Sequence, residues 1–216
     1  MSRKHVKRTT HDARRTTNIA VLASGNGSNF EAIVGAIKRG YIKKTCVKLL
    51  ITDKEKAYVR VRAERLGITQ LYINPREYNT GGAFDKKLIQ VLKKEKIGLV
   101  VLAGYMRILT PVFVKKFKNK VINIHPALLP AFKGARAIGD AYRYGVKITG
   151  VTVHFVDECI DHGPIIAQKP LPVKKGESLS GLERRIHRAE HTLYPLVIKK
   201  ISEGKVKVRN RHVQVG

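Results

Sequence analysis

The sequence predicts an α/β fold, in which a mostly parallel, twisted sheet carries helices on both faces and its last strands are partly antiparallel. Two observations lead to this prediction. As far as residue 124, short and continuously apolar runs alternate with segments of helical periodicity, and after that point the pattern changes. Strands that are apolar on both sides are typical of parallel sheets, because helices cover both faces of such sheets.

The parallel part is expected to begin with a strand at residues 18–23, NIAVLA, a turn SGNGSN and a helix in FEAIVGAIKRG. The apolar residues of that helix recur at helical spacing and stop at Gly40, and glycine is a common helix terminator. The same apolar signature predicts further strands at 47–52, 69–73, 98–103 and 120–124, with helices near 56–66, 82–95 and 111–118.

After His125 a different arrangement is expected. The sequence predicts a helix near 137–144, strands in KITGVTVHFV and PIIAQKPLPV, and an amphipathic helix at about 178–203. Alternation of apolar and polar residues in the first of these strands favours antiparallel pairing. Since the chain shows neither an internal repeat nor a low-complexity linker, residues 18–216 are expected to form one domain after a basic N-terminal arm at residues 1–17.

The formal net charge of +27 is the unusual feature of the composition. The content of hydrophobic residues, 43% of 216 residues, is ordinary for a globular protein. The basic excess is spread along the chain. It has two interpretations, a solvated lysine-rich surface or a field that attracts polyanions. The second includes anionic substrates and, without sequence preference, nucleic acid. The sequence leaves open whether the protein is a monomer or a homodimer.

Cysteine content and hydropathy favour a cytoplasmic protein. Cys46 and Cys159 lie far apart and outside any CxxC pattern, so neither a disulfide framework nor a structural zinc site is indicated. Cys159 would be reactive if it were exposed. No apolar run reaches the roughly 18 residues that span a bilayer, so no membrane association is expected. The first 17 residues weakly resemble an organelle transit segment, but a disordered basic arm is the preferred interpretation.

Asn123 and His125 follow a strand-like stretch in VINIHPALLP, and Asp161 stands in HFVDECIDHGP. These residue types fit acyl transfer, because an amide stabilises an oxyanion, an imidazole moves a proton, and a carboxylate orients the imidazole. Neither run holds an obvious Ser or Cys nucleophile, which favours direct attack by a substrate amine. The alternative is a buried structural histidine with two polar residues that cap loops.

The turn SGNGSN is the candidate phosphate site, because glycines and free amides at a helix start can hold an anion. Phe30 stands where a dinucleotide-binding loop needs its third glycine, and a P-loop ending is missing, so neither NAD nor ATP is favoured. The alternative is a glycine turn in which Ser28 or Asn29 caps the helix.

Other histidines give weaker signals. His154 and Phe155, on the strand before Asp161, are interpreted as packing residues. His187 and His191 flank Glu190 at helical spacing, but they complete no zinc pattern, and no metal is predicted.

Five runs resemble the folate-dependent glycinamide ribonucleotide formyltransferases of purine biosynthesis. They are VLASGNGSNFEAI, VVLAGYMRILTP, VINIHPALLP, GVTVHFVDECIDHGPIIAQ and AEHTLYP, and they extend over about residues 18 to 205. Members of this family move a formyl group from 10-formyltetrahydrofolate to the amine of a ribosyl-phosphate glycinamide. The resemblance implies a formyltransferase-like variant of the Rossmann fold, with 10-formyltetrahydrofolate as a consumed cosubstrate.

The resemblance also assigns roles to residues. It implies that the catalytic set is Asn123, His125 and Asp161, and it places Glu190 near the glycinamide. The residues implied to hold the substrate phosphate are Gly27, Ser28 and Asn29. The residues implied to line the folate site are Met106, Arg107, Ile108 and Leu109, together with Asn123 and Asp161.

Four positions depart from the pattern of this family and are expected to surround the ligand pocket: Gly81, Arg136, Cys159 and His162. The catalytic set is unchanged. The expected reaction is attack of the substrate amine on the formyl carbon, with Asn123 and protonated His125 stabilising the oxyanion. Two alternatives remain. One is a formyltransferase for an amino sugar or initiator tRNA, and the other is a non-catalytic, basic nucleic-acid-binding protein on the same fold.

Overall fold

The computed structural model describes residues 16–216, so the expected basic arm lies outside the described residues except at its end. The strands of the main sheet are β1 (Thr17–Leu22), β2 (Thr45–Thr52), β3 (Gln70–Tyr72), β4 (Leu99–Leu102), β5 (Val121–His125), β6 (Ile148–Phe155) and β7 (Ile165–Pro172). The helices are α1 (Ser28–Lys38), α2 (Val59–Leu66), α3 (Gly81–Lys94), α4 (Pro111–Lys116), α5 (Ala137–Tyr144) and α6 (Leu179–Ser202), with a 3-10 turn, η1, at Pro75–Glu77. Every predicted strand and helix is present, with its ends shifted by a few residues at most. Thr17, which was assigned to the arm, already belongs to β1.

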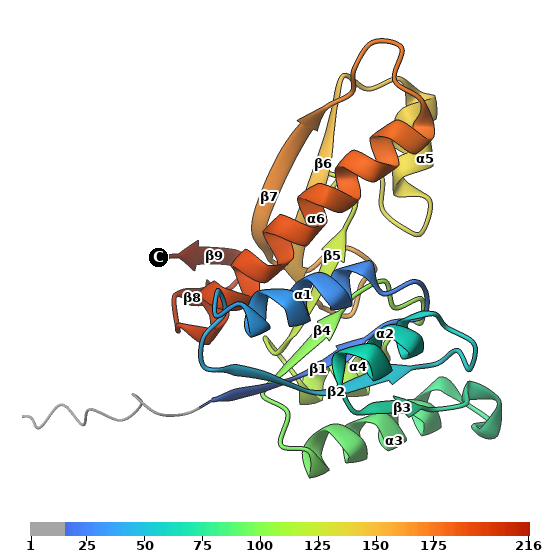
Figure 1. The fold of residues 1–216 in the computed structure, drawn as a ribbon, viewed down its shortest axis with the longest axis vertical. Helices are drawn as coiled ribbons and strands as arrows, with labels where there is room; N and C mark the ends of the chain where they lie inside the picture. Colours follow the sequence, from blue (N-terminus) through green and yellow to red (C-terminus); the bar gives the residue numbers. More distant parts are fainter. Residues whose placement is uncertain (1–15) are drawn as a thin grey trace, which may run out of the picture.

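The sheet confirms the predicted fold class. Its strand order is β3-β2-β1-β4-β5-β6-β7. The first five strands pair in parallel, whereas β6 is antiparallel to β5 and β7 is antiparallel to β6. In Figure 1 the antiparallel strands and α6 extend away from the parallel part of the molecule.

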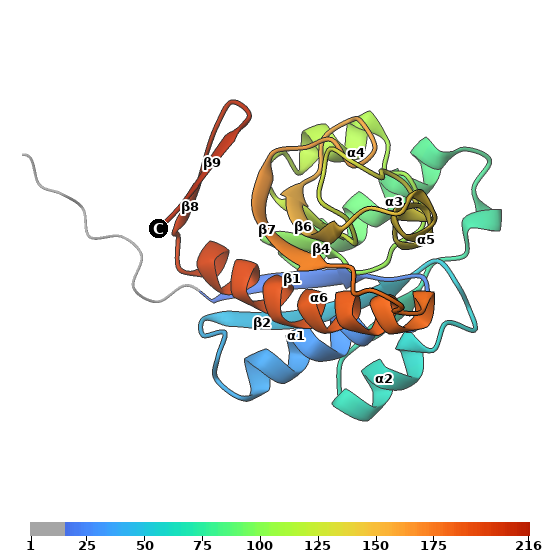
Figure 2. The same cartoon turned by 90° about the horizontal axis from the view of Figure 1, so that it is seen from above.

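Two apolar cores, one on each face, explain why the strands are apolar on both sides. Ile19 and Val21 of β1 pack in the core beneath α1, α2 and α6, whereas Ala20 and Leu22 pack in the core beneath α3 and α4. Figure 2 shows these two groups of helices on opposite sides of the sheet. Successive side chains of a strand point to opposite faces, so a continuous apolar run fits a strand covered on both.

A small antiparallel hairpin, β8 (Val206–Arg209) and β9 (His212–Val215), was not predicted. The sequence contains a signal for it, since VKVR and HVQV alternate around Asn210, whose φ of 53° suits a tight turn. The hairpin also contacts the β6–β7 loop, because Nη2 of Arg211 donates a 2.6 Å hydrogen bond to the carbonyl oxygen of His162.

The order of the strands positions the functional cleft. β1 and β4 are neighbours, and the chain leaves β1 toward the face of α1 but leaves β4 toward the face of α4. In open α/β sheets, ligands bind beyond the carboxyl ends of the strands at such a switch point.

Within residues 16–216, no helix is both long enough and apolar enough to cross a membrane.

Candidate active site

A cleft of about 1080 Å³ lies beyond the carboxyl ends of β1, β4 and β5. Each residue that the sequence assigned to a site lines it. The volume is at the upper end of the range of small-molecule sites, which leaves room for two substrates side by side. The walls come mainly from six parts of the chain: the β1–α1 turn, the segment after β4, the end of β5, residues 134–143 before and within α5, the β6–β7 loop and α6.

The predicted catalytic residues meet at one end of this cleft. Asn123 and His125 lie two residues apart on β5, so their side chains share one face of the sheet. Nδ1 of His125 lies 3.3 Å from Oδ2 of Asp161, and Nδ2 of Asn123 donates to Oδ1 of the same carboxylate over 3.3 Å. The contact between the imidazole and the carboxylate is therefore direct.

The hydrogen bonds of His125 define which ring nitrogen can react. Nε2 lies 2.7 Å from the carbonyl oxygen of Phe132, and a carbonyl only accepts, so Nε2 carries a proton. Nδ1 is then the atom that gains or loses a proton beside Asp161. Burial lowers the pKa of His125, although the Asp161 charge opposes this effect. The free site therefore favours the neutral ring, and the protonated ring expected from the sequence has to form during the reaction.

Asp161 is held as a carboxylate. Burial alone would raise its pKa, but the nearby ring of His154, the hydrogen bond from the Gly134 amide and the nearby ring of His125 together lower it to about 2. The Gly134 amide donates to Oδ2 over 2.8 Å. Asp161 has a φ of 46°, in the left-handed region, and the loop closes at Gly163, where a Cβ atom would lie 1.8 Å from the Phe155 carbonyl oxygen. A side chain at Gly163 would therefore displace the loop that carries Asp161.

His154, which the sequence indicated as a packing residue, is buried and also contacts the predicted catalytic residues. It is 2% exposed, and it pairs with Asn123 in the β5–β6 register. Its Nδ1 lies 2.7 Å from the Phe155 carbonyl oxygen, which leaves Nε2 to face the site, 3.3 Å from Nδ2 of Asn123 and 3.7 Å from Oδ1 of Asp161. Nε2 of His154 is therefore placed to accept from the Asn123 amide, and the ring lies beside the carboxylate. Sequence spacing gave no sign of this role, since the contact depends on strand pairing.

The other end of the cleft is the start of α1. The N-cap of this helix is Gly27, with φ 80°, and no side chain caps the first turn. The alternative in which Ser28 or Asn29 caps the helix is therefore wrong. A Cβ atom at Gly27 would lie 2.3 Å from Cγ2 of Val59, so only glycine fits here. The amides that open α1 are free of a side-chain cap and line the cleft, which is the arrangement that an anion needs.

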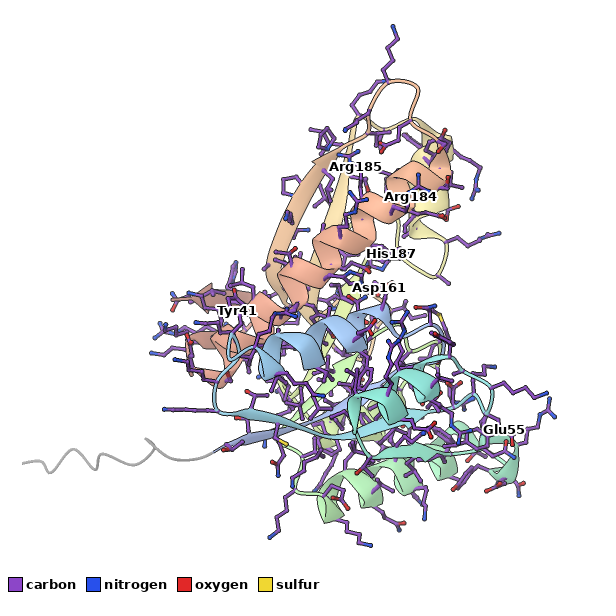
Figure 3. The ribbon with its side chains drawn as sticks, in the orientation of Figure 1. Tyr41, Glu55, Asp161, Arg184, Arg185 and His187 are labelled. Atoms are coloured by element: carbon purple, nitrogen blue, oxygen red, sulfur yellow. The ribbon has the colours of Figure 1, made fainter. Side chains whose placement is uncertain are left out.

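A buried polar cluster supports this helix start from α6. Glu190 is 4% exposed, and its Oε2 accepts a 2.9 Å hydrogen bond from Nδ2 of Asn29 and lies 2.9 Å from Nδ1 of His187. The hydrogen bond to Glu190 raises the pKa of His187, against the effect of burial, whereas burial lowers the pKa of His191. Figure 3 labels His187, on α6, and Asp161, and both residues line the cleft.

The segment after β4 forms an apolar wall. Met106 and Ile108 are 67% and 72% exposed, and Leu109 is buried. Such exposed apolar side chains inside a cleft fit a flat aromatic ring. The guanidinium of Arg107 lies 4.4 Å from the ring centroid of Phe84, where it makes a cation–π contact.

The backbone of that wall is held by a pair that sequence analysis missed. Oγ of Ser24 accepts a 2.9 Å hydrogen bond from the Met106 amide and donates a 2.6 Å hydrogen bond to Oδ1 of Asp53. Ser24 follows β1 and Asp53 follows β2, so the sheet brings the two together.

The four departures from the family pattern were expected to surround the pocket, and this is only half right. Arg136 and Cys159 line the cleft, whereas Gly81 and His162 do not. Gly81 begins α3, and the ring of His162 turns to Asp157, with Nδ1 2.7 Å from Oδ2.

Comparison with known proteins shows the family of this chain. Residues 17–198 match the family model described as formyl transferase. Phosphoribosylglycinamide formyltransferase of Bacillus subtilis (strain 168) is 46% identical over 182 residues, which cover 84% of this chain and 93% of that protein. The human trifunctional purine biosynthetic protein adenosine-3 is 38% identical over 195 residues, which are 90% of this chain but only 19% of that longer protein.

Solved structures of glycinamide ribonucleotide transformylases share the fold of this chain. Glycinamide ribonucleotide transformylase 1 from Symbiobacterium toebii superposes with a TM-score of 0.90 at 40% identity, covering 93% of this chain and 94% of that one. The enzyme of the same name from Geobacillus kaustophilus gives a TM-score of 0.84 at 46% identity, covering 87% and 99%.

Proposed function

The chain belongs to the formyl transferase family, and we propose that it transfers a formyl group from 10-formyltetrahydrofolate to the amine of glycinamide ribonucleotide in purine biosynthesis. Relatives of similar length that carry this activity in their names support the substrate assignment. The observation that carries the proposal is that one cleft joins an uncapped helix start, an apolar wall and an Asn–His–Asp cluster. These three features fit a phosphate, a pterin and a reacting amine.

The reaction needs one nucleophilic attack and one net proton transfer. The amine nitrogen bonds to the formyl carbon while the carbonyl oxygen becomes an oxyanion, and the carbonyl then re-forms as the bond to N10 of the folate breaks. The acceptor amine loses one proton and N10 gains one, so the overall proton count balances. The protein therefore has to stabilise the oxyanion and carry a proton over a short distance.

Asn123 provides the donor for the oxyanion. Its Nδ2 hydrogens point at His154 and Asp161 over 3.3 Å each, and bonds of this length are weak. When the formyl oxygen becomes negative, one hydrogen turns to it, because a charged acceptor binds more strongly than a neutral ring nitrogen. Contacts of this kind commonly tighten only when substrates are bound.

His125 and Asp161 act as one proton-accepting unit. The neutral ring, favoured by burial, takes the proton of the attacking amine at Nδ1. The carboxylate 3.3 Å away stabilises the imidazolium that forms, and it remains ionised because its own pKa is about 2. The imidazolium stabilises the oxyanion and returns the proton to N10 of the departing folate.

The remaining residues position the two substrates. Amides at the start of α1, together with the positive end of the helix dipole, hold the nucleotide phosphate. Glu190 holds Asn29 in place over 2.9 Å and lies at the acceptor end of the cleft. Met106, Ile108 and Leu109 supply the apolar surface for the pterin ring, and the Ser24 and Asp53 pair holds that surface in position.

A transfer assay with two acceptors tests the proposal. Glycinamide ribonucleotide should be formylated with 10-formyltetrahydrofolate as donor, and glycinamide without its ribosyl phosphate should be formylated far less efficiently. Absence of transfer to the nucleotide by protein with a folded circular dichroism spectrum would refute the proposal. An amino sugar and initiator methionyl-tRNA serve as alternative acceptors, and a salt-sensitive RNA gel shift without any transfer would support the nucleic-acid-binding alternative.

A further inference from the structure

Three side chains of different chemistry converge in the β6–β7 loop: a carboxylate, a thiol and an imidazole. They belong to Asp157, Cys159 and His162, and one ligand atom from each lies within 4.8 Å of the other two. We propose that these residues form a binding site for a divalent cation of the zinc class. Two of the three, Cys159 and His162, are positions at which this chain departs from the family pattern.

The loop already holds the three groups close together. Oδ2 of Asp157 lies 2.7 Å from Nδ1 of His162, and Oδ1 of Asp157 accepts a 3.0 Å hydrogen bond from the Cys159 amide. The second contact closes a tight turn that brings the cysteine back toward the carboxylate. A cation would therefore bind to a loop that is already folded around its position.

The three groups are accessible from solvent. Cys159 is exposed and not in a disulfide, and the side chains of Asp157 and His162 are 33% and 42% exposed. A cation could therefore enter and leave without unfolding of the protein. The same exposure leaves the thiol accessible to a metal ion.

The chemistry of the donors selects the cation. Thiolate, imidazole and carboxylate are the ligands of tetrahedral Zn²⁺, and three protein ligands leave a fourth position for water. Cobalt(II) and nickel(II) suit the same donors, whereas Mg²⁺ and Ca²⁺ prefer sites made of oxygen alone. The site should therefore discriminate strongly against the two hard cations.

Neighbouring charges influence the affinity of this site for a divalent cation. Nη1 of Arg211 lies 3.4 Å from Nδ1 of His162, and its positive charge opposes a second cation there. The other arm of the guanidinium is bound to the His162 carbonyl, so Arg211 stays beside the site. Glu158, next in the chain, is paired with Lys115 at 3.7 Å. Arg211→Gln should therefore tighten metal binding.

Titration of the full-length protein with Co²⁺ under reducing conditions tests the proposal. A thiolate bound to Co²⁺ absorbs in the near ultraviolet, and the first 15 residues contain no cysteine, so this band reports on Cys159 or Cys46 alone. We expect a band that saturates at one equivalent, is removed by Zn²⁺ and is unaffected by Mg²⁺. Cys159→Ser should abolish the band, and Asp157→Asn and His162→Gln should each weaken binding by about tenfold or more.

Matched controls distinguish this site from adventitious binding. Cys46→Ser and Asp140→Asn should leave the band and the affinity unchanged, because both residues lie outside the loop. The proposal is overturned if wild-type protein shows no thiolate band at millimolar Co²⁺, or if the band survives in Cys159→Ser and disappears in Cys46→Ser. Melting temperatures measured without metal verify that each variant is folded.

Discussion

The two ends of the cleft are built in different ways. The acceptor end, where we propose that the nucleotide phosphate binds, presents backbone amides of consecutive residues, Gly27 to Asn29, at the start of one helix. The transfer end, where we propose that the formyl group moves, is formed by side chains of Asn123, His125, His154 and Asp161, which come from two paired strands and a loop. A motif of consecutive residues is visible in sequence, whereas a cluster from separate segments depends on how the sheet assembles.

The ends also differ in their electrostatics. At the transfer end, burial keeps His125 neutral while its neighbours keep Asp161 ionised. At the acceptor end, the charge of Glu190 favours a protonated His187. Substitutions at the transfer end should therefore lower turnover, and those at the acceptor end should raise the KM for the nucleotide.

The largest effect is expected at His125. Replacing it with alanine should lower turnover by about 100-fold or more, since it removes proton transfer and stabilisation of the oxyanion. Binding of a folate analogue should change little. Single-turnover assays measure the loss, with His212→Ala, a substitution of an exposed histidine, as the control.

The double variant His125→Ala with Asp161→Asn should lose much less turnover than the product of the two single losses, because the two groups act together. Near-normal transfer by folded His125→Ala would exclude the proposed mechanism.

The second effect concerns the acceptor end. Gly27→Ala places a Cβ atom against Val59 in a left-handed backbone conformation, which should displace the amides that we propose hold the phosphate. The loss of one charge-assisted hydrogen bond, about 1.5–3 kcal/mol, corresponds to a rise of roughly 10- to 100-fold in the KM for the nucleotide. Gly25→Ala is the matched control, because a Cβ atom there meets nothing within 4 Å. Equal losses of nucleotide and folate-analogue binding would instead indicate general misfolding.

A third test separates charge from shape at the transfer end. Asp161→Asn preserves the size of the side chain but removes the charge that raises the pKa of His125 against the effect of burial. That pKa should fall further, and the acidic limb of the turnover profile should move to lower pH by about one unit. The profile is measured in single-turnover assays from pH 4.5 to 9. An unshifted acidic limb would show that His125 does not titrate in the transfer step.

A smaller effect is expected from His187→Gln. The pKa of His187 is raised by its hydrogen bond to Glu190, so its contribution to stability is fully present below the ordinary histidine pKa of about 6.5 and is lost as pH rises through the raised value. The side chain is half exposed, which limits the contribution to about 1 kcal/mol at most. Urea unfolding at pH 6 and pH 9 measures it. A difference between variant and wild type that is the same at both pH values would contradict this role.

The smallest effect is expected from removal of residues 1–16. The match to the family model begins at residue 17, where β1 also begins. We propose that the arm is dispensable for transfer, so specific activity should be nearly unchanged. Assays at low and high salt test this. A large loss of turnover at low salt alone would show that the basic arm helps to capture anionic substrates.

The sequence by itself determined the order of strands and helices along the chain, the apolar character of the strands and the antiparallel pairing at the end of the sheet. These features are local, because each strand or helix carries its own periodicity. The SGNGSN turn was predictable for the same reason. The β8–β9 hairpin was missed although its alternation is visible in the sequence, and the bounds of the other elements moved by only a few residues.

Only the tertiary structure decided which side chains meet. Asn29 and Glu190 share a hydrogen bond although 161 residues separate them, and Asn123 contacts His154 because β5 and β6 pair in that register. Ser24 and Asp53 follow two neighbouring strands and support the apolar wall together. The protonation of His125 likewise depends on burial, which is a property of the folded chain. Periodicity determines which face a residue takes, but strand order and register determine its neighbours, and the chemistry of the site depends on those neighbours.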